Sequence, residues 1–515
     1  MPTIKSPIAK HREATYKLAR SLAKGEIHHW LLDHGYFPEN YVLPPCFAVT
    51  ARPPKPKIYY RVKKKGKEFK VDRTECVNVH FPKSEFTDRT FGIIHPHIHN
   101  DIAYHLARNW LRIVDAMVPP DSRVASYSFP IPIDSRTPGR LGYLRSGRMI
   151  YEFIAMTDAD ISSVAYKYSH MVKADIKNFY PSIYTHSIAW ALHGKAFIRK
   201  PVNLHSYSHL GNRLDRLFQN ANDGCTNGIP IGPVVSDVIA EVIASAVDRL
   251  LTKMLASEAI DYEAVRFKDD YRILVKSETD AKVVIKSLQA ALKEYNLELS
   301  DEKTKIATLP DGLFREWVSK YHAAYPKRLR AFSWKQFREL YLAVINIDRT
   351  CPGTGVIDRF LADITNKKGQ LKLWIGDYNL EKVISMLLML ATLRVKAFPK
   401  VMAILEMLLK SPFGLIHQAQ IVEYLENYLQ RLAKEEDRNK YLISWISYFL
   451  VSHDLVKLLS FKPKFKDPIT RSIFNNRCAV FKDIKDFKLF VGCKAISKKV
   501  SMFEHLDVFD PPQVT

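Results

Sequence analysis

Three aspartates of this sequence could hold divalent metal ions. Asp175 closes the strand-like run HMVKAD, and Asp269 and Asp270 separate two further strand-like runs, YEAVRF and YRILVKS. Ionised carboxylates that meet at strand ends repel one another, and hard cations such as Mg²⁺, which prefer carboxylate and phosphate oxygens, relieve that repulsion. Two such ions can activate a hydroxyl and stabilise the pyrophosphate that leaves in a phosphoryl transfer. An Asp-Asp pair is also ordinary hairpin-turn chemistry, so its surroundings must decide between the two interpretations.

The segments around these aspartates predict how they are positioned. Residues 171–310 alternate strand and helix patterns, and the run VVSDVIAEVIASAVDRLLTKML repeats apolar residues at helical spacing. Lys-Asp-Asp between strand-like runs predicts a hairpin, and Thr279-Asp280 offers an N-cap to a helix over AKVVIKSLQAALKEY. NLELSDEKTKIATL then returns to a strand. This order predicts a split βαβ sheet with helices on one face, whose other, solvated face could carry a nucleic-acid duplex.

Outside this region the sequence changes character. Residues 111–170 begin with a helix-like segment and continue as Pro-punctuated extended segments, SYSFPIPIDSRTPGRLGYLRSGRMIYEFI. From about residue 330 onward the pattern is helical, with apolar or amphipathic stretches at Leu380–Leu393, Val401–Leu409, Ile421–Leu432 and Tyr441–Leu459. This spacing indicates a solenoid of paired helices, although no sequence repeat is visible and an irregular helical domain stays an alternative. The later run FKPKFKDPITRSIFNNRCAVFKDIKDFKLF interleaves basic residues with Phe, as suits single-stranded nucleic acid or a solvated helix face.

The composition favours a nucleic-acid partner. In 515 residues, 77 Lys and Arg against 54 Asp and Glu give a net charge of +23, which supports phosphate contacts with release of counterions. Six cysteines without a CxxC pair argue against a structural zinc site and against a disulfide-stapled secreted fold. The N-terminus lacks an apolar signal core, and no apolar stretch is long enough to span a membrane. The expected location is therefore the cytoplasm, without a membrane partner.

Four segments, taken in order, resemble the motifs of reverse transcriptases. KADIKNFYPSI resembles motif A, GIPIGPVVSDVIAE motif B, RFKDDYRILV motif C with Phe267 in place of the usual tyrosine, and LELSDEKTKI motif D. Together they cover roughly residues 170–310 in the family's order. The resemblance implies an RNA-directed DNA polymerase-like nucleotidyltransferase with fingers and a palm. Its cofactor would be Mg²⁺ or Mn²⁺, and its substrates would be dNTPs.

The resemblance also implies roles for single residues. Asp175, Asp269 and Asp270, with the backbone carbonyl of Ile176, would hold the metal ions. Lys303 would donate a proton to the leaving pyrophosphate or neutralise it, although a lone lysine is more often solvated. Tyr180 stands at the family's steric-gate position, where its ring would clash with a ribose 2′-hydroxyl; by itself it would be a packed aromatic. The other nucleotide-binding residues that the resemblance implies are Arg148, Gly228, Pro230 and Ile231.

Three departures from ordinary reverse transcriptases point to a subgroup. Ile231 stands where retron and group II intron enzymes carry Gln, and no Leu-Gly primer-grip motif follows motif D. A long helical region replaces the short three-helix thumb. This combination resembles the abortive-infection (AbiK-type) reverse transcriptases, which are phage-defence proteins. It implies an α+β fold with a basic N-terminal region and fingers at 1–170, a palm at 171–320, and an all-α, HEAT-like repeat domain at 321–515.

AbiK-type enzymes make DNA without a template and attach the first nucleotide to a tyrosine of their own chain. The resemblance therefore implies a covalently attached, single-stranded DNA product and a homo-oligomer. The sequence does not select the priming residue; its N-terminal candidates are Tyr16, Tyr36, Tyr41, Tyr59 and Tyr60.

Three other interpretations accompany this reading. One is a conventional RNA-templated reverse transcriptase of retron or group II type, and another is an inactive polymerase-like scaffold that binds nucleic acid. A third concerns metal binding by the histidines His95, His97, His99 and His105. HPHIH alternates like a strand, and no nearby acid or cysteine completes a tetrahedral set, so we do not expect zinc there.

Overall fold

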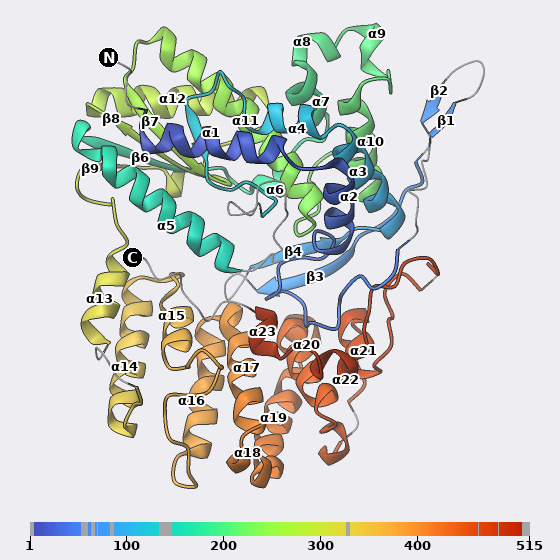
Figure 1. The fold of residues 1–515 in the computed structure, drawn as a ribbon, viewed down its shortest axis with the longest axis vertical. Coiled ribbons are helices and arrows are strands. Elements are labelled where there is room, and N and C mark those ends of the chain that lie inside the picture. Colours follow the sequence, from blue (N-terminus) through green and yellow to red (C-terminus); the bar gives the residue numbers. More distant parts are fainter. Residues whose placement is uncertain are drawn as a thin grey trace.

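The computed structural model of the protein describes residues 5–52, 60–62, 67–69, 71–82, 87–132, 147–325, 330–461, 463–482 and 484–506, and for 60–62, 67–69 and 147–155 it describes the backbone alone. A sheet with its helices forms one part of the molecule, and a row of helices from the second half of the chain forms the other (Figure 1). Among the helices that the structure describes, none combines the length and apolar character that crossing a bilayer requires.

The central sheet has five strands in the order β5-β7-β8-β6-β9. The strands are β5 (Val124–Ser126), β6 (His170–Asp175), β7 (Tyr262–Phe267), β8 (Asp270–Val275) and β9 (Lys305–Thr308). β6, β7, β8 and β9 pair antiparallel, and β5 adds a parallel edge strand beside β7 that the sequence did not predict. The antiparallel four have the order of a split βαβ unit, as the alternation of strand and helix patterns predicts.

One face of this sheet is covered by the helices that the sequence predicts. α11 (Val234–Ser257) is buried along most of its length, and α12 (Glu278–Glu294) packs against α11 and β6. The N-cap of α12 is Ser277, whose hydroxyl accepts a hydrogen bond from the Asp280 amide at 3.1 Å. The prediction of Thr279 as the cap was therefore wrong, because the chain is already helical from Glu278 onward.

A helix also covers part of the opposite face. α5 (Gly147–Val164) replaces the extended segment predicted at RMIYEFI, and its Ile161 and Val164 pack with Met171, Val265 and Leu274 of the sheet. The prediction of an open, solvated face was therefore wrong for this part of the sheet. Apolar side chains point to that face as well as to the other, so a cover that removes them from water is favourable.

The remaining elements of the first half surround the sheet. They are α1 (Pro7–Arg20), α2 (Lys24–Asp33), β1 (Tyr60–Val62), β2 (Lys67–Phe69), β3 (Val77–Pro82), β4 (Asp88–Ile93), α3 (Pro96–Arg108), α4 (Trp110–Met117), η1 (Ala165–Lys167), α6 (Phe179–Ser182), α7 (His186–His193), α8 (Lys195–Ile198), α9 (Pro201–Leu204), α10 (Leu210–Ala221) and η2 (Asp301–Lys303). The strand-like reading of HPHIH was wrong: Pro96 stands in the first helical turn, and the His99 amide donates to the His95 carbonyl at 3.0 Å.

The second half of the described chain is helical. Its elements are α13 (Glu316–Ala324), α14 (Trp334–Thr350), α15 (Val356–Asp363), α16 (Leu380–Leu393), η3 (Val395–Ala397), α17 (Phe398–Leu409), α18 (Pro412–Ile416), α19 (Gln418–Ala433), α20 (Glu436–Ser452), η4 (Val456–Leu458), α21 (Pro468–Phe474), α22 (Cys493–Ser497) and α23 (Met502–Leu506). The four stretches predicted as helical lie in α16, α17, α19 and α20 with its following turn. A HEAT-like repeat and the three domain limits stay predictions.

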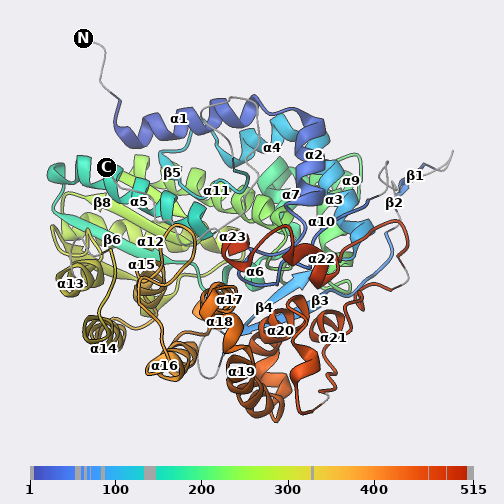
Figure 2. The ribbon, with the colours of Figure 1, turned by 60° about the horizontal axis from the view of Figure 1, so that its bottom comes forward.

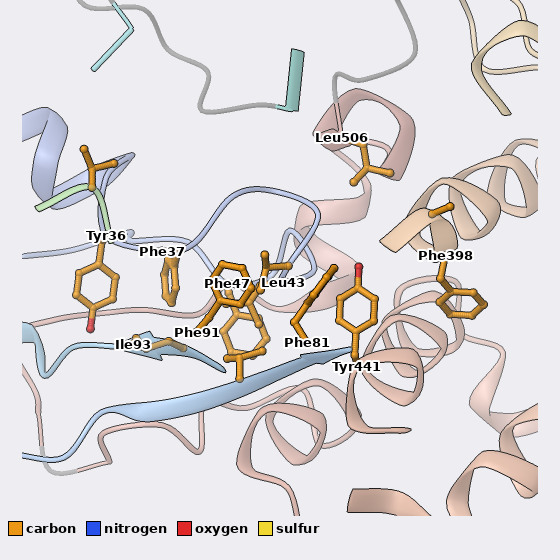
Figure 3. Close-up of a cluster of buried hydrophobic side chains, with 14 of the residues drawn as sticks. Tyr36, Phe37, Leu43, Phe47, Phe81, Phe91, Ile93, Phe398, Tyr441 and Leu506 are labelled. Carbon is orange, nitrogen blue, oxygen red and sulfur yellow. The ribbon is translucent and has the colours of Figure 1, made fainter. Parts of the chain in front are cut away.

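The C-terminal helices pack directly on the N-terminal segment 36–52. The Tyr441 hydroxyl of α20 donates to the Tyr41 carbonyl at 2.6 Å, and the Val491 amide donates to the Cys46 carbonyl at 2.8 Å. Aromatic side chains from the N-terminal segment, β3, β4, α17 and α20 gather in one buried cluster (Figure 3). Phe487 of the basic, Phe-rich run is buried here, so this ring is not free to stack on a nucleic-acid base. Figure 2 shows the same contact from below, with α20 and α22 near β3 and β4.

Candidate active site

The three aspartates meet at one end of the sheet. Asp175 is the last residue of β6 and pairs across the strands with Asp270, the first residue of β8. Asp269 stands in the tight turn between β7 and β8, and its carbonyl accepts a hydrogen bond from the Ile176 amide at 3.1 Å. Antiparallel pairing thus brings residues 175 and 270 side by side, although they lie far apart in the chain.

The close approach of these carboxylates shifts the pKa values of Asp269, Asp270 and the neighbouring Lys303. Burial raises the pKa of Asp270 to about 7, with help from the charge of Asp269 and a hydrogen bond to Asp175, although the residue keeps an exposed surface. Burial and the charge of Asp175 also raise the pKa of Asp269. Lys303 Nζ lies 2.9 Å from Asp175 Oδ2. Burial alone would lower the pKa of Lys303, but the bond to Asp175 and the nearby acids outweigh burial and raise it.

The donor set suits a divalent cation. Carboxylate oxygens are the ligands that Mg²⁺ and Mn²⁺ prefer. Burial and the neighbouring carboxylates raise the pKa values of Asp269 and Asp270, and a bound cation would offset both effects. Among the described residues, no three His, Cys, Asp or Glu side chains are already gathered around one point as a metal cluster. The Lys303 ammonium and a hydrogen bond to Asp270 engage Asp175 instead. A cation would replace these two contacts.

A large cavity opens from the aspartates. Its volume is about 1340 Å³, above the roughly 300–1,000 Å³ of typical small-ligand sites, so it has room for a nucleotide and the end of a strand. Its walls come from the N-terminal segment, β4, the turn after β6, the start of α11, the β7–β8 turn, α12 and the segment before β9. The sequence-predicted site residues that line it are Asp175, Ile176, Tyr180, Ile231, Asp269 and Lys303.

Tyr180 is held at both its backbone and its side chain. Its carbonyl accepts a hydrogen bond from the Ile229 amide at 3.1 Å, and its hydroxyl donates to Asp237 Oδ1 at 2.5 Å. The ring is half-buried and meets Phe179 edge to face. Asp237 was not among the residues that sequence reasoning selected, although it lies within the segment that resembles motif B.

The glycines of GIPIGP shape the wall that carries Ile231. Gly228 and Gly232 have φ values of +83° and +123°, which favour glycine. A Cβ on Gly232 would lie 2.9 Å from Pro38 and 3.2 Å from the Phe91 ring, so the N-terminal segment and β4 could not approach as closely. Gly228 and Pro230 are not among the described residues that line the cavity. The side chain of Arg148 lies outside the described side chains.

Comparison with known proteins identifies a domain that contains these aspartates. Residues 136–340 match the family model described as "Reverse transcriptase (RNA-dependent DNA polymerase)". The chain contains a reverse transcriptase domain. The domain is that of an RNA-directed DNA polymerase-like nucleotidyltransferase, and Asp175, Asp269 and Asp270 all lie within the matched range.

Other comparisons give weaker likenesses. No curated protein matches the sequence. Among solved structures, apo telomerase from Candida tropicalis has 12% identity and a TM-score of 0.33, over 66% of this chain and 65% of that one. Telomerase from Candida albicans with the TWJ fragment of telomeric RNA has 14% identity and a TM-score of 0.23, over 62% and 53% of the two chains. This chain thus spans less than two thirds of either telomerase chain.

A buried ionic network supports the reverse transcriptase hairpin from behind. Arg266, in β7, is fully buried, and its Nη2 lies 2.8 Å from Glu241 Oε1 of α11. Its Nη1 also donates to the Lys268 carbonyl in the turn at 2.9 Å. The sequence held a signal for this residue, since a charged side chain in the apolar run YEAVRF needs a buried partner.

Lysines on α12 add positive charge to the wall of the reverse transcriptase cavity. Lys286 and Lys293 line it, as does Lys177 after β6. These three side chains are exposed and make no ion pair with a described residue. Sequence reasoning missed the two on α12. Their spacing of seven residues, two turns of one helix face, was the available signal.

Proposed function

We propose that this protein polymerises dNTPs without copying a template. The observation that carries the proposal is that Asp175, Asp269 and Asp270 meet at the end of the sheet, where Asp175 and Asp269 line the large cavity together with Tyr180 and Lys303. Divalent cations on these carboxylates would activate a hydroxyl and neutralise the leaving pyrophosphate. Lys303, placed 2.9 Å from Asp175, would supply a proton or charge to the pyrophosphate. Tyr180 would select deoxyribose.

The position of α5 supports synthesis without a template. A primer–template duplex on the predicted open face would have to displace α5, which packs there through Ile161 and Val164. Asp158 of α5 also bonds Arg272 of β8 at 2.6 Å and Arg315 at 3.1 Å. Thr157 of α5 lines a smaller cavity of about 270 Å³ together with Asp175 and Asp270. A single strand that grows from the large cavity needs no such displacement.

The environments of the N-terminal tyrosines favour Tyr41 as the primer. The Tyr16 hydroxyl donates to Asp115 at 2.9 Å outside the cavity, and the Tyr36 hydroxyl is buried against the Ile94 carbonyl at 2.6 Å. The remaining candidates cannot be compared in this way, since Tyr59 lies outside the described residues and the side chain of Tyr60 outside the described side chains.

Tyr41 lines the cavity that contains Asp175 and Asp269. Burial raises the pKa of Tyr41 well above 10, and its hydroxyl is hydrogen-bonded to Glu39. Glu39 in turn lies 3.7 Å from Lys268, the residue before Asp269. In the proposed first step the Tyr41 oxygen bonds to the α-phosphorus of a dNTP, while the bond from that phosphorus to the oxygen bridging to the β-phosphate breaks. Glu39 accepts the hydroxyl proton, and pyrophosphate leaves.

The test is incorporation without template or primer. Purified protein is incubated with labelled dNTPs and Mg²⁺ or Mn²⁺, denatured, and examined for label on the polypeptide. We expect covalent label in the native protein and none in Asp269→Ala. Tyr41→Phe should lose this label yet still extend a supplied DNA oligonucleotide, whereas Tyr16→Phe should behave as the native protein.

Two other outcomes would contradict the proposal. The family match to RNA-dependent DNA polymerases favours a conventional enzyme as the second candidate, and label that appears only with an RNA template and an annealed primer would support it. Absence of incorporation under every condition would instead favour the inactive nucleic-acid-binding scaffold.

The resemblance to abortive-infection enzymes supports a cellular role in phage defence, with a homo-oligomer as the working form. Phage should then form fewer plaques on bacteria that express the native protein than on bacteria that express Asp269→Ala at the same level. Equal numbers of plaques on the two strains would contradict the role in phage defence but would leave the proposed polymerase reaction unaffected. Sedimentation of the purified protein would give its oligomeric state.

A further inference from the structure

We infer that Asp237 is a positioning residue that holds the Tyr180 ring in the orientation that selects the sugar. The inference rests on the proposed function, in which Tyr180 excludes ribonucleotides. It adds Asp237 as the group that keeps the Tyr180 ring in place. Both side chains line the large cavity that contains Asp175 and Asp269. The Tyr180 hydroxyl donates to Asp237 Oδ1 at 2.5 Å, a short bond to a charged acceptor, which is the stronger kind of hydrogen bond.

Asp237 is a rigid anchor. It lies in the first turn of α11, where a negative charge is favoured by the positive end of the helix dipole. Its neighbours Val235 and Val238 are fully buried, so the start of this helix cannot shift without disrupting the core. The backbone of Tyr180 is tied to the same segment through the Ile229 amide at 3.1 Å. Two bonds from one segment therefore fix the position of the ring.

Steric exclusion of ribose does not by itself require the hydroxyl group of Tyr180. A wall that acts by bulk alone requires only an aromatic ring, and the hydroxyl of a tyrosine adds nothing to its width. On the cavity side the ring has open space, since the cavity holds about 1340 Å³. A ring without its anchor could rotate into that space and make room for a 2′-hydroxyl. The bond to Asp237 removes that freedom, so its effect appears in the choice between sugars.

The test compares kcat/KM for dCTP and CTP in single and double variants. We expect Tyr180→Phe and Asp237→Ala each to lower the dCTP preference about tenfold, which corresponds to the loss of about 1.4 kcal/mol. The change in preference should come mainly from a rise in kcat/KM for CTP. The double variant should lose no more preference than either single variant, because both remove the same bond. Asp237→Asn, which keeps an oxygen acceptor, should retain part of the preference.

Asp301→Ala is the control, because it removes a different acid, an exposed one, from the same cavity wall. The dCTP preference of Asp301→Ala should equal that of the native protein. A lower preference in this variant would show that the loss of any negative charge from the cavity wall has this effect, and it would overturn the inference. An equal loss of kcat/KM for dCTP and for CTP in Asp237→Ala would also overturn the inference. Such a loss would indicate that Asp237 contacts the substrate directly or that the protein needs it to fold. An unchanged preference in Tyr180→Phe would show that the hydroxyl has no part in selection.

Equilibrium binding separates this inference from the proposed function. If the native protein incorporates no nucleotide, the polymerase proposal fails, but binding of dCTP and CTP with Mg²⁺ can still be measured. A native preference for dCTP that Asp237→Ala abolishes would support the clamp even then. Binding without preference between the two sugars in the native protein would overturn it.

Discussion

Arg266 and Asp248 form a buried ion pair beneath the turn that carries Asp269, with Arg266 Nε 2.9 Å from Asp248 Oδ2. Glu241 binds the same guanidinium, and the Tyr271 hydroxyl donates to Asp248 at 2.7 Å. The network joins β7 and β8 to α11. It therefore couples the position of the catalytic turn to the helix that also carries Asp237.

Arg266→Ala should destabilise the protein strongly. Removal of the guanidinium leaves the carboxylates of Glu241 and Asp248 buried without a cation, which costs about 3–5 kcal/mol of the free energy of unfolding. Urea unfolding followed by circular dichroism measures this loss. The control is Arg249→Ala, which removes a half-exposed pair with Asp121 and should cost about 1 kcal/mol or less. Equal losses in the two variants would contradict a special role for the buried network.

Asp158→Lys should release α5 from the sheet. The substitution replaces the contacts to Arg272 and Arg315 by repulsion between like charges. We expect faster amide hydrogen exchange in α5 and tighter binding of a primer–template duplex, because the covered face becomes accessible. Ser163→Lys introduces a lysine at an exposed position of α5, with half the change in charge, and serves as the control for the added lysine. Faster exchange without a gain in duplex binding would show that α5 does not exclude the template.

Charge reversal on α12 should weaken nucleotide binding. Lys286 and Lys293 line the cavity, where they would attract the triphosphate, so the double variant Lys286→Glu/Lys293→Glu should raise KM for dNTPs about tenfold. Lys282→Glu is the control on the same helix, since Lys282 pairs with Glu278 and is not among the lining residues. The difference between the two should shrink at high salt, as exposed charges are screened. An equal rise of KM in the double variant and in Lys282→Glu would show that the position of the lysines in the cavity wall has no part in nucleotide binding.

Stability should fall as the pH is lowered below neutrality, in part through His99. Complete burial lowers the pKa of His99 to about 4, and its Nε2 is hydrogen-bonded to the Leu31 carbonyl. The unfolded chain, with an ordinary histidine pKa near 6.5, binds a proton between these values while the folded protein does not. At pH 5 this single group therefore costs about 2 kcal/mol relative to pH 7.5. The change in unfolding free energy with pH should be smaller in His99→Gln, and an unchanged slope would contradict this account.

Much of the secondary structure could be predicted from local sequence. The hairpin at Lys268-Asp269, the long α11 and the four C-terminal helices follow from periodicity and turn chemistry, which act over a few residues. The grouping of Asp175 with Asp270 was also predictable, because antiparallel strand order fixes which strand ends meet. The failures at RMIYEFI and HPHIH were local too: proline punctuation and alternation suggested extended chain, but helical hydrogen bonds and packing prevailed.

What the sequence by itself determined is the set of acids, their strand ends and the family to which their motifs point. Only the tertiary structure decided what surrounds them. The cover of α5 on the sheet, the bond between Tyr180 and Asp237, and the place of Tyr41 in the cavity join residues from distant segments. Such contacts depend on how apolar faces and buried charges are satisfied across the whole core. No pattern within a single element records them.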